Sequence, residues 1–312
     1  MKTRLTMMVA GMLVAAVLGG CEGQGWNWFE NGSEKPQTES RMRLDKPVEY
    51  AAAARSFNRS IDYLDRIKAR VNILLTYFDE EGNERHEDPE GVLQIVRPNK
   101  LAVSLGKAGQ VLFWFGCDPE EYWWLDLTDK TKRIAAIGRH EMFDDATAQR
   151  IGMPIKPLDL IRLLGVVKMD VTARGATQWS DSGKLLGISS PIGDRGFQRV
   201  WVDPTTMVVS SIEIFDRQRN MVLVAEHSGT ELVEVTRDIP GLKVGQVRMP
   251  SRVEITHLET KAKVRVTMTG VRDDKISEKA FDLPTLLDKY PVDRTIDLDA
   301  KKRAAASAAG KP

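Results

Sequence analysis

Cysteine and histidine are scarce in this sequence, which limits the chemistry it can perform. Its 312 residues include two cysteines and four histidines. Cys21 closes an N-terminal leader, so we expect no intrachain disulfide, and Cys117, inside an apolar strand, is predicted to be a buried thiol. His86 stands in an acidic turn, His140 lacks the second histidine of an H-E-x-x-H motif, and His227 lies in a predicted strand. The sequence therefore predicts no metal site and no catalytic cysteine.

Signatures of nucleotide-binding and hydrolytic enzymes are also missing. The sequence contains no P-loop, no G-x-G-x-x-G and no G-x-S-x-G motif. The 45 basic and 44 acidic residues are interspersed and give a formal net charge of +1. A chain so close to neutral offers no electrostatic basis for binding nucleic acid. We therefore expect no enzyme activity, no catalytic residues, no cofactor and no nucleic-acid partner.

A long hydrophobic run is lacking too, although the N-terminus has a short one. Met7 to Leu18 is apolar, but a membrane-spanning helix needs about 20 such residues. Lys2 and Arg4 precede the run, as in a signal peptide. The run ends in Leu18-Gly19-Gly20-Cys21, which resembles the lipobox of bacterial lipoproteins. That resemblance implies cleavage before Cys21 and attachment of acyl chains such as palmitate to it; an ordinary secretory signal with a chance cysteine is the alternative.

The whole chain divides by composition into four parts. Residues 1–20 are the predicted lipoprotein signal peptide, and residues 21–46 are the lipidated cysteine and a polar, flexible tether. Residues 47–290 carry the hydrophobic patterning of one folded domain, and residues 291–312 are predicted to be a disordered tail. Acyl chains contribute about 0.8 kcal/mol per buried methylene. We therefore expect the protein to be lipid-anchored to a membrane facing the periplasm, the outer membrane in preference to the inner.

Hydrophobic periodicity within the domain predicts mostly strands. Ala54, Phe57, Ile61 and Leu64 follow helical spacing in a helix over 47–68. Strands are predicted between 71 and 137, two short helices at 139–151 and 157–164, and further strands between 168 and 271. Short turns join the strands and favour antiparallel hairpins. The fold class is thus mainly β with a few helices (α+β), a highly twisted antiparallel sheet with helices on its concave face; a plain β-sandwich is the alternative.

One predicted hairpin is unusually apolar. Residues 111–127 read VLFWFGCDPEEYWWLDL, and Val111 to Phe115 is apolar on both faces of the strand. A strand with one face in solvent would alternate apolar and polar side chains. This strand must therefore be covered on both faces, either by a cavity and its cover or by the two layers of a sandwich.

Residues 57–138 contain an amphipathic helix and a following strand, Gly91 at the start of a strand, Arg97-Pro98-Asn99 at its end, and the aromatic strand Tyr122-Trp123-Trp124-Leu125-Asp126. In this series they resemble the LolA/LolB lipoprotein-carrier family, which sorts lipoproteins to the outer membrane. Residues 199–220 resemble the later hairpin of the family, in which a "DP" turn joins two strands. The chain departs from the family in an enlarged middle, residues 139–195.

The resemblance implies an unclosed β-barrel with a hydrophobic cavity under helices, in which the family binds the acyl chains of lipoproteins. It makes Phe113, Phe115, Trp124 and Leu223 candidates for the cavity lining. It also makes Arg97 a candidate latch that holds a helical lid formed by parts of residues 139–164. The expected partners are the membrane, lipoprotein acyl chains or lipid, and envelope proteins. A periplasmic lipid sensor or adaptor, and a structural envelope lipoprotein without ligand, remain alternatives.

Overall fold

The computed structural model describes residues 48–78, 83–144, 147, 155–193, 196–235 and 248–309. All of them belong to one compact unit, Lys46–Pro312. The predicted signal peptide, Cys21 and the tether lie outside the described residues, as do residues 145–146 and 148–151 of the helix predicted at 139–151. The described start of that segment is the end of a strand at Arg139 and a 3₁₀ turn, η1 (His140–Met142), instead of an α-helix.

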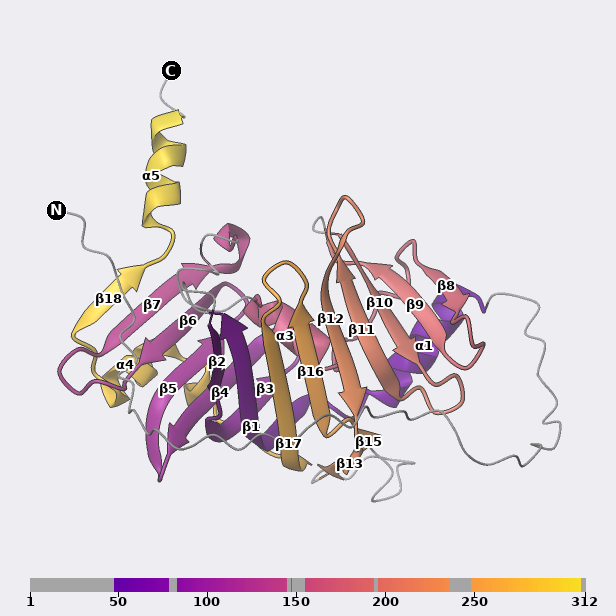
Figure 1. The fold of residues 1–312 in the computed structure, drawn as a ribbon, viewed down its shortest axis with the longest axis horizontal. Coiled ribbons are helices and arrows are strands. Elements are labelled where there is room, and N and C mark those ends of the chain that lie inside the picture. Colours follow the sequence, from indigo (N-terminus) through magenta and orange to yellow (C-terminus); the bar gives the residue numbers. More distant parts are fainter. Residues whose placement is uncertain are drawn as a thin grey trace, which may run out of the picture. The chain divides into compact units, whose positions relative to one another are not determined.

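A single large sheet dominates the described part of the chain (Figure 1). Its strands along the first part of the chain are β1 (Arg66–Phe78), β2 (Glu84–Glu87), β3 (Glu90–Val96), β4 (Lys100–Lys107), β5 (Gln110–Cys117), β6 (Glu121–Asp126) and β7 (Ile134–Arg139). Those of the second part are β8 (Ala176–Trp179), β9 (Leu186–Pro191), β10 (Phe197–Val202), β11 (Val209–Phe215), β12 (Met221–Ser228), β14 (Glu234–Val235), β16 (Arg252–His257), β17 (Lys263–Asp273) and β18 (Arg294–Asp297). A separate two-stranded ribbon pairs β13 (Glu231–Leu232) with β15 (Arg248–Met249).

The order of strands shows how the two meanders join. It runs β18-β7-β6-β5-β4-β3-β1-β17-β16-β12-β11-β10-β9-β8. The pairing of β1 with β17 is antiparallel and links the first meander to the second. Neither end strand, β18 or β8, has a further partner among the described residues, so the sheet stays open. The predicted twisted antiparallel sheet, an unclosed barrel rather than a sandwich, is confirmed.

Helices α1 (Tyr50–Ser60) and α3 (Pro157–Leu163) cover one face of this sheet, which we call the inner face. Figure 1 shows α1 behind the strands β8 to β10. Ala54 and Phe57 of α1 and Ile161 of α3 are fully buried in one cluster with inward side chains of strands from both meanders. Burial of this apolar surface, at about 25 cal/mol per Å², is the main force that holds the helices on the sheet.

The first helix is shorter than predicted. It ends at Ser60, and β1 begins at Arg66, so the second half of the predicted helix 47–68 is a turn followed by strand. Ile61 and Leu64 are nevertheless buried, as the periodicity required. These side chains can be buried from a helix or from a turn, so the spacing of apolar residues predicted a helix that is longer than the one observed. A second correction concerns the strand predicted at 168–176, where the chain is irregular and β8 begins only at Ala176.

A second, smaller core lies on the opposite, outer face of β4 to β7. Trp114, Trp123 and Leu125 pack there with Ile276 and Phe281, next to the 3₁₀ turn η2 (Glu278–Ala280) and helix α4 (Leu283–Lys289). The Asp282 carboxylate accepts a hydrogen bond from the Thr285 N–H and caps α4. The apolar hairpin at 111–127 is therefore covered on both faces, by α3 and the main core inside and by α4 outside.

The segment after residue 290 corrects the predicted boundary of the domain. Residues 291–312 were predicted to be a disordered tail, yet β18 pairs in parallel with β7, and helix α5 (Ala300–Ala309) follows. Leu298 is buried, and the Asp299 carboxylate accepts a hydrogen bond from the Arg139 N–H at 2.7 Å. Low sequence complexity misled the prediction, because the few residues that dock this segment stand just before the alanine-rich stretch.

Candidate functional site

Three of the four predicted lining residues meet on the inner face of β5 and β6. Phe113 and Phe115 are two residues apart on β5, and Trp124 is the cross-strand partner of Phe115. The ring centroids of Phe113 and Trp124 are 5.4 Å apart, and those of Phe115 and Trp124 are 6.1 Å apart. Phe115 is buried, whereas Phe113 and Trp124 are half-buried. The pair Phe113–Trp124 is thus the more accessible part of this aromatic group.

Leu223 lies elsewhere on the same face. It is buried on β12, in the second meander, and belongs to the same continuous core as the aromatic group. The structure therefore places all four candidates on the inner face but brings only three together. Phe115 and Leu223 are buried under the described helices and strands, so an apolar ligand that contacts them has to displace part of this cover.

Helix α3 contacts β4 and β5, and β5 carries Phe113 and Phe115 of the aromatic group. Its seven residues begin at Pro157, in the first turn, and its C-terminal end is bonded to the sheet through His227 of β12. The His227 Nε2–H donates to the Leu163 carbonyl at 2.9 Å. Burial lowers the pKa of the His227 imidazole to about 4, so the ring is neutral at physiological pH.

Arg97 fastens the chain just beyond α3. It follows β3, and its Nη1 donates to the Val166 carbonyl at 3.2 Å. Its Nη2 donates to the Asp62 carbonyl at 3.2 Å and to Asp65 Oδ1 at 2.5 Å. The side chain is only 6% exposed, so it does not extend into water. One planar guanidinium thus joins the turn after α1 to the segment after α3.

The contacts of Arg97 refine the predicted latch. The prediction placed its partner within residues 139–164, whereas the described partner is Val166, two residues beyond that range. Residues 145–146 and 148–154 lie outside the described residues, so the earlier part of the predicted lid is not tested by these contacts. Bonding to main-chain carbonyls of covering segments, which the prediction required, is present.

Asn58 of α1 forms a second set of hydrogen bonds to the segment that follows α3. Its side-chain Nδ2 donates to the Met169 carbonyl, and its Oδ1 accepts from the Met169 N–H, both at 2.8 Å. The Tyr50 hydroxyl donates to the Asp170 carbonyl at 2.8 Å. These bonds run from α1 to residues 169–170, so α1 and the segment after α3 are held as one cover. Sequence reasoning missed both residues because their partners are more than 100 positions away.

A buried polar bridge connects α3 to the far meander. Arg162 Nη1 donates to Gln198 Oε1 at 3.4 Å, and Gln198 Nε2 donates to Ser190 Oγ at 3.0 Å. Gln198 and Ser190 are buried on β10 and β9. The cover is therefore attached by polar bonds at its margins and by apolar packing at its centre. Buried hydrogen bonds of this kind fix geometry but contribute only about 0.5–1.5 kcal/mol each.

The structure also describes the predicted thiol. Cys117 is a buried thiol whose pKa is raised to about 12 by burial, which makes it unreactive. Among the described residues, no cluster of histidine, cysteine and carboxylate side chains is placed to hold a metal ion. The described helices are all too short or too polar to cross a membrane.

Comparisons with known proteins identify the fold. No family model matches the sequence, and no curated protein matches it either. Among solved structures, the chain is similar to a DUF1329 family protein from Desulfovibrio piger, with 11% identity, a TM-score of 0.51, and coverage of 76% of this chain and 97% of that one. An outer membrane lipoprotein-sorting protein domain from Vibrio parahaemolyticus gives the same identity, TM-score and coverage. The predicted resemblance is confirmed at the level of the fold, which this chain shares with lipoprotein-sorting domains.

Proposed function

We propose that this protein is a membrane-anchored envelope lipoprotein whose inner sheet face binds the acyl chains of lipoproteins or lipids. The observation that carries the proposal is the aromatic group Phe113, Phe115 and Trp124 on the inner face of β5 and β6, with α3 lying on β5 and the neighbouring β4. Helix α3 is short and is hydrogen-bonded to the sheet through His227 and Gln198, and acyl chains could replace the apolar contacts that its buried Ile161 and Leu163 make. The fold shared with a lipoprotein-sorting domain supports the same function.

In this proposal Cys21 carries the lipid anchor and the tether allows the domain to reach cargo away from the membrane. Arg97 and Asn58 hold the cover closed in the absence of cargo. The protein acts as a binding protein and not as an enzyme, in the periplasm and at the outer membrane in preference to the inner membrane. Acyl chains gain about 0.8 kcal/mol per buried methylene, which offsets the packing lost when α3 moves.

Lipid extraction of the purified full chain tests the proposal. We expect mass spectrometry to find acyl lipid bound beyond the covalent anchor, and a fluorescent fatty acid to compete with it. Phe113→Asn should weaken this binding, whereas Met221→Asn, at an exposed position on the other meander, should not. A chain that purifies without lipid and binds no fatty acid would contradict the proposal and favour a structural envelope lipoprotein.

A further inference from the structure

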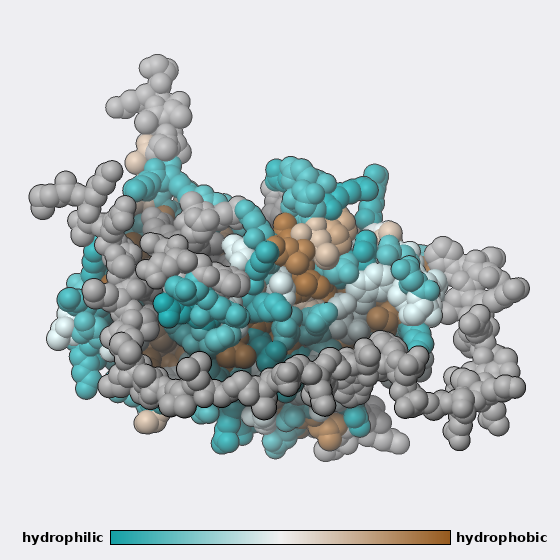
Figure 2. Space-filling model, viewed as in Figure 1, coloured by the Kyte–Doolittle hydropathy of each residue, from teal (hydrophilic) through white to brown (hydrophobic). Residues whose placement is uncertain are grey.

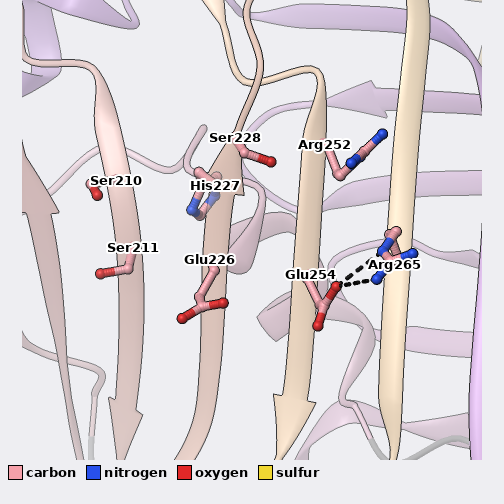
Figure 3. A pocket seen from close by; sticks show the side chains of 8 residues that line it. All are labelled: Ser210, Ser211, Glu226, His227, Ser228, Arg252, Glu254 and Arg265. Carbon is pink, nitrogen blue, oxygen red and sulfur yellow. Dashed lines mark hydrogen bonds and ion pairs between the residues drawn. The ribbon is translucent and has the colours of Figure 1, made fainter. Parts of the chain in front are cut away.

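A polar pocket opens on the second meander, with a row of charged side chains on the outer face of the sheet; its lining also includes His227, whose Nε2–H donates to the Leu163 carbonyl. Its volume is about 450 Å³, within the range of small-molecule sites. Side chains of β11, β12, β16 and β17 line it (Figure 3). Figure 2 shows that the described surface in this view is largely hydrophilic, with hydrophobic atoms gathered over the upper part of β12.

The register of the strands aligns the side chains that line the pocket. Ser211, Glu226, Glu254 and Arg265 are successive cross-strand partners and form one row across four strands. Side chains alternate between faces along a strand, so this row is opposite the buried Ala225 and Ile255. Ser228 and Arg252 are partners in the next row.

A β-bulge adds a second hydroxyl to the row. Trp201 pairs with Ser211 and Val202 with Val209, so Ser210 is the extra residue on β11. A bulge of this kind changes the direction of a side chain and leaves the extra residue without its hydrogen bond to the neighbouring strand. Ser210 and Ser211 both line the pocket as a result.

Two of the four charged side chains in the pocket, Arg265 and Glu254, form an ion pair with each other, and the other two are Glu226 and Arg252. Arg265 donates to Glu254 Oε2 through Nε at 2.9 Å and Nη2 at 2.7 Å. Glu226 stands directly opposite Glu254, and like charges in such positions destabilise a sheet. In the described part of the chain, no side chain pairs with Glu226 or Arg252. Figure 3 shows these two side chains, on neighbouring strands, pointing in different directions.

From this arrangement we infer that the pocket binds a zwitterion of the phosphoethanolamine type. Glu226 accepts hydrogen bonds from the ammonium group. Arg252 binds the phosphate through its planar fork of donors, and the hydroxyls of Ser210, Ser211 and Ser228 supply the further donors that phosphate oxygens need. The net charge of the lining is zero, which suits a ligand with both signs and disfavours a simple anion or cation. The site does not depend on acyl binding at the inner face.

The inference is tested by titrating the full chain with free phosphoethanolamine and measuring the heat of binding by calorimetry. We expect saturable binding that phosphocholine reproduces weakly, because its quaternary ammonium has no N–H for Glu226. Glu226→Gln and Arg252→Gln should each lower the affinity about 10- to 100-fold, as expected for lost charge-assisted hydrogen bonds. Glu259→Gln in the β16–β17 hairpin and Arg294→Gln on β18 are matched controls that should bind normally.

Vesicles distinguish the source of the ligand. Since a lipid anchor binds any bilayer, the measurement is the difference in binding between phosphatidylethanolamine and phosphatidylcholine vesicles, in wild type and in Glu226→Gln. A difference that disappears in the variant identifies a lipid headgroup as the ligand, and binding of free phosphoethanolamine alone identifies a soluble zwitterion. Absence of binding in both arms, or equal binding by Glu226→Gln, Arg252→Gln and wild type, would overturn the inference.

Discussion

Replacing Arg97 with leucine should loosen the cover of the inner face while the sheet remains intact. The leucine keeps apolar bulk but removes the donors to the Val166 and Asp62 carbonyls and to Asp65. Val166 is buried, so its carbonyl loses its guanidinium donor without gaining water, at a cost of about 1–3 kcal/mol. Asp62 and Asp65 are exposed and can bond to water, and the ion pair to Asp65 adds at most about 1 kcal/mol.

A loss of about 1–3 kcal/mol in local stability corresponds to amide exchange that is about 5- to 150-fold faster. We expect this acceleration at Leu164 and Gly165, whose N–H groups donate to the Leu160 and Arg162 carbonyls. Hydrogen exchange with mass spectrometry should show it in peptides covering 157–170, while peptides from β10 and β11 keep their protection. Arg97→Lys, which retains the charge but not the fork of donors, should give an intermediate rate.

The reasoning is refuted if exchange over 157–170 is unchanged in Arg97→Leu. It is also refuted if β10 and β11 lose protection equally, because Arg97 would then stabilise the whole domain and not its cover. Asn72→Ala is the matched control: it removes the exposed hydrogen bond from Asn72 to Asp88 and should leave the exchange of the cover unaltered.

Three further predictions concern the anchor, the inner face and pH. Cys21→Ala should abolish labelling by a fatty-acid analogue and release the domain from membranes, and persistent labelling would exclude Cys21 as the acylated residue. Phe113→Asn, at a half-buried position, should reduce fatty-acid binding with little change in melting temperature. Phe115→Ala, at a buried position, should lower the free energy of unfolding by about 3–5 kcal/mol. If both variants lose the same amount of stability, the inner face is a closed core. The pKa of His227 is about 4 in the folded state, below the value of about 6.5 expected in the unfolded chain. Between these two pH values the unfolded chain therefore binds one more proton than the folded protein, and the free energy of unfolding measured in urea should fall by roughly 1–3 kcal/mol as the pH is lowered from about 6.5 to about 4. The fall should be smaller in His227→Gln.

The architecture could be predicted because local patterns determine it. Alternation in β17 places Val266 and Met268 inside and Arg265 outside, as the sequence indicated. Gly91 is required where β3 meets β4, since a Cβ there would lie 1.8 Å from the Ser104 carbonyl oxygen. Each of these features depends on residues within one strand or one hairpin.

Features that depend on distant partners were missed. The Asn58–Met169 clasp joins residues 111 positions apart, and a lone asparagine on a helix carries no pattern that names its partner. The same holds for His227, which was interpreted as an ordinary sheet residue and proved to hold the end of α3. The docking of β18 was overlooked because four residues beside a low-complexity stretch give no periodic signal.

The two covers of the apolar hairpin differ in a way that bears on which of them can open. On the outer face, Trp114 and Trp123 pack against the surroundings of α4 in a core that is apolar throughout, and Gly116 leaves room for the Trp123 indole, which lies 2.7 Å from where a Cβ would be. On the inner face, α3 and the segment after it are attached by Arg97, Asn58, His227 and Arg162. Ile161 and Leu163 of α3 are also buried in the main core, so opening the inner face both breaks these polar bonds and exposes apolar surface. Acyl chains bound there, as we propose, would cover that surface again, and the outer core would keep β5 and β6 in place while they bind.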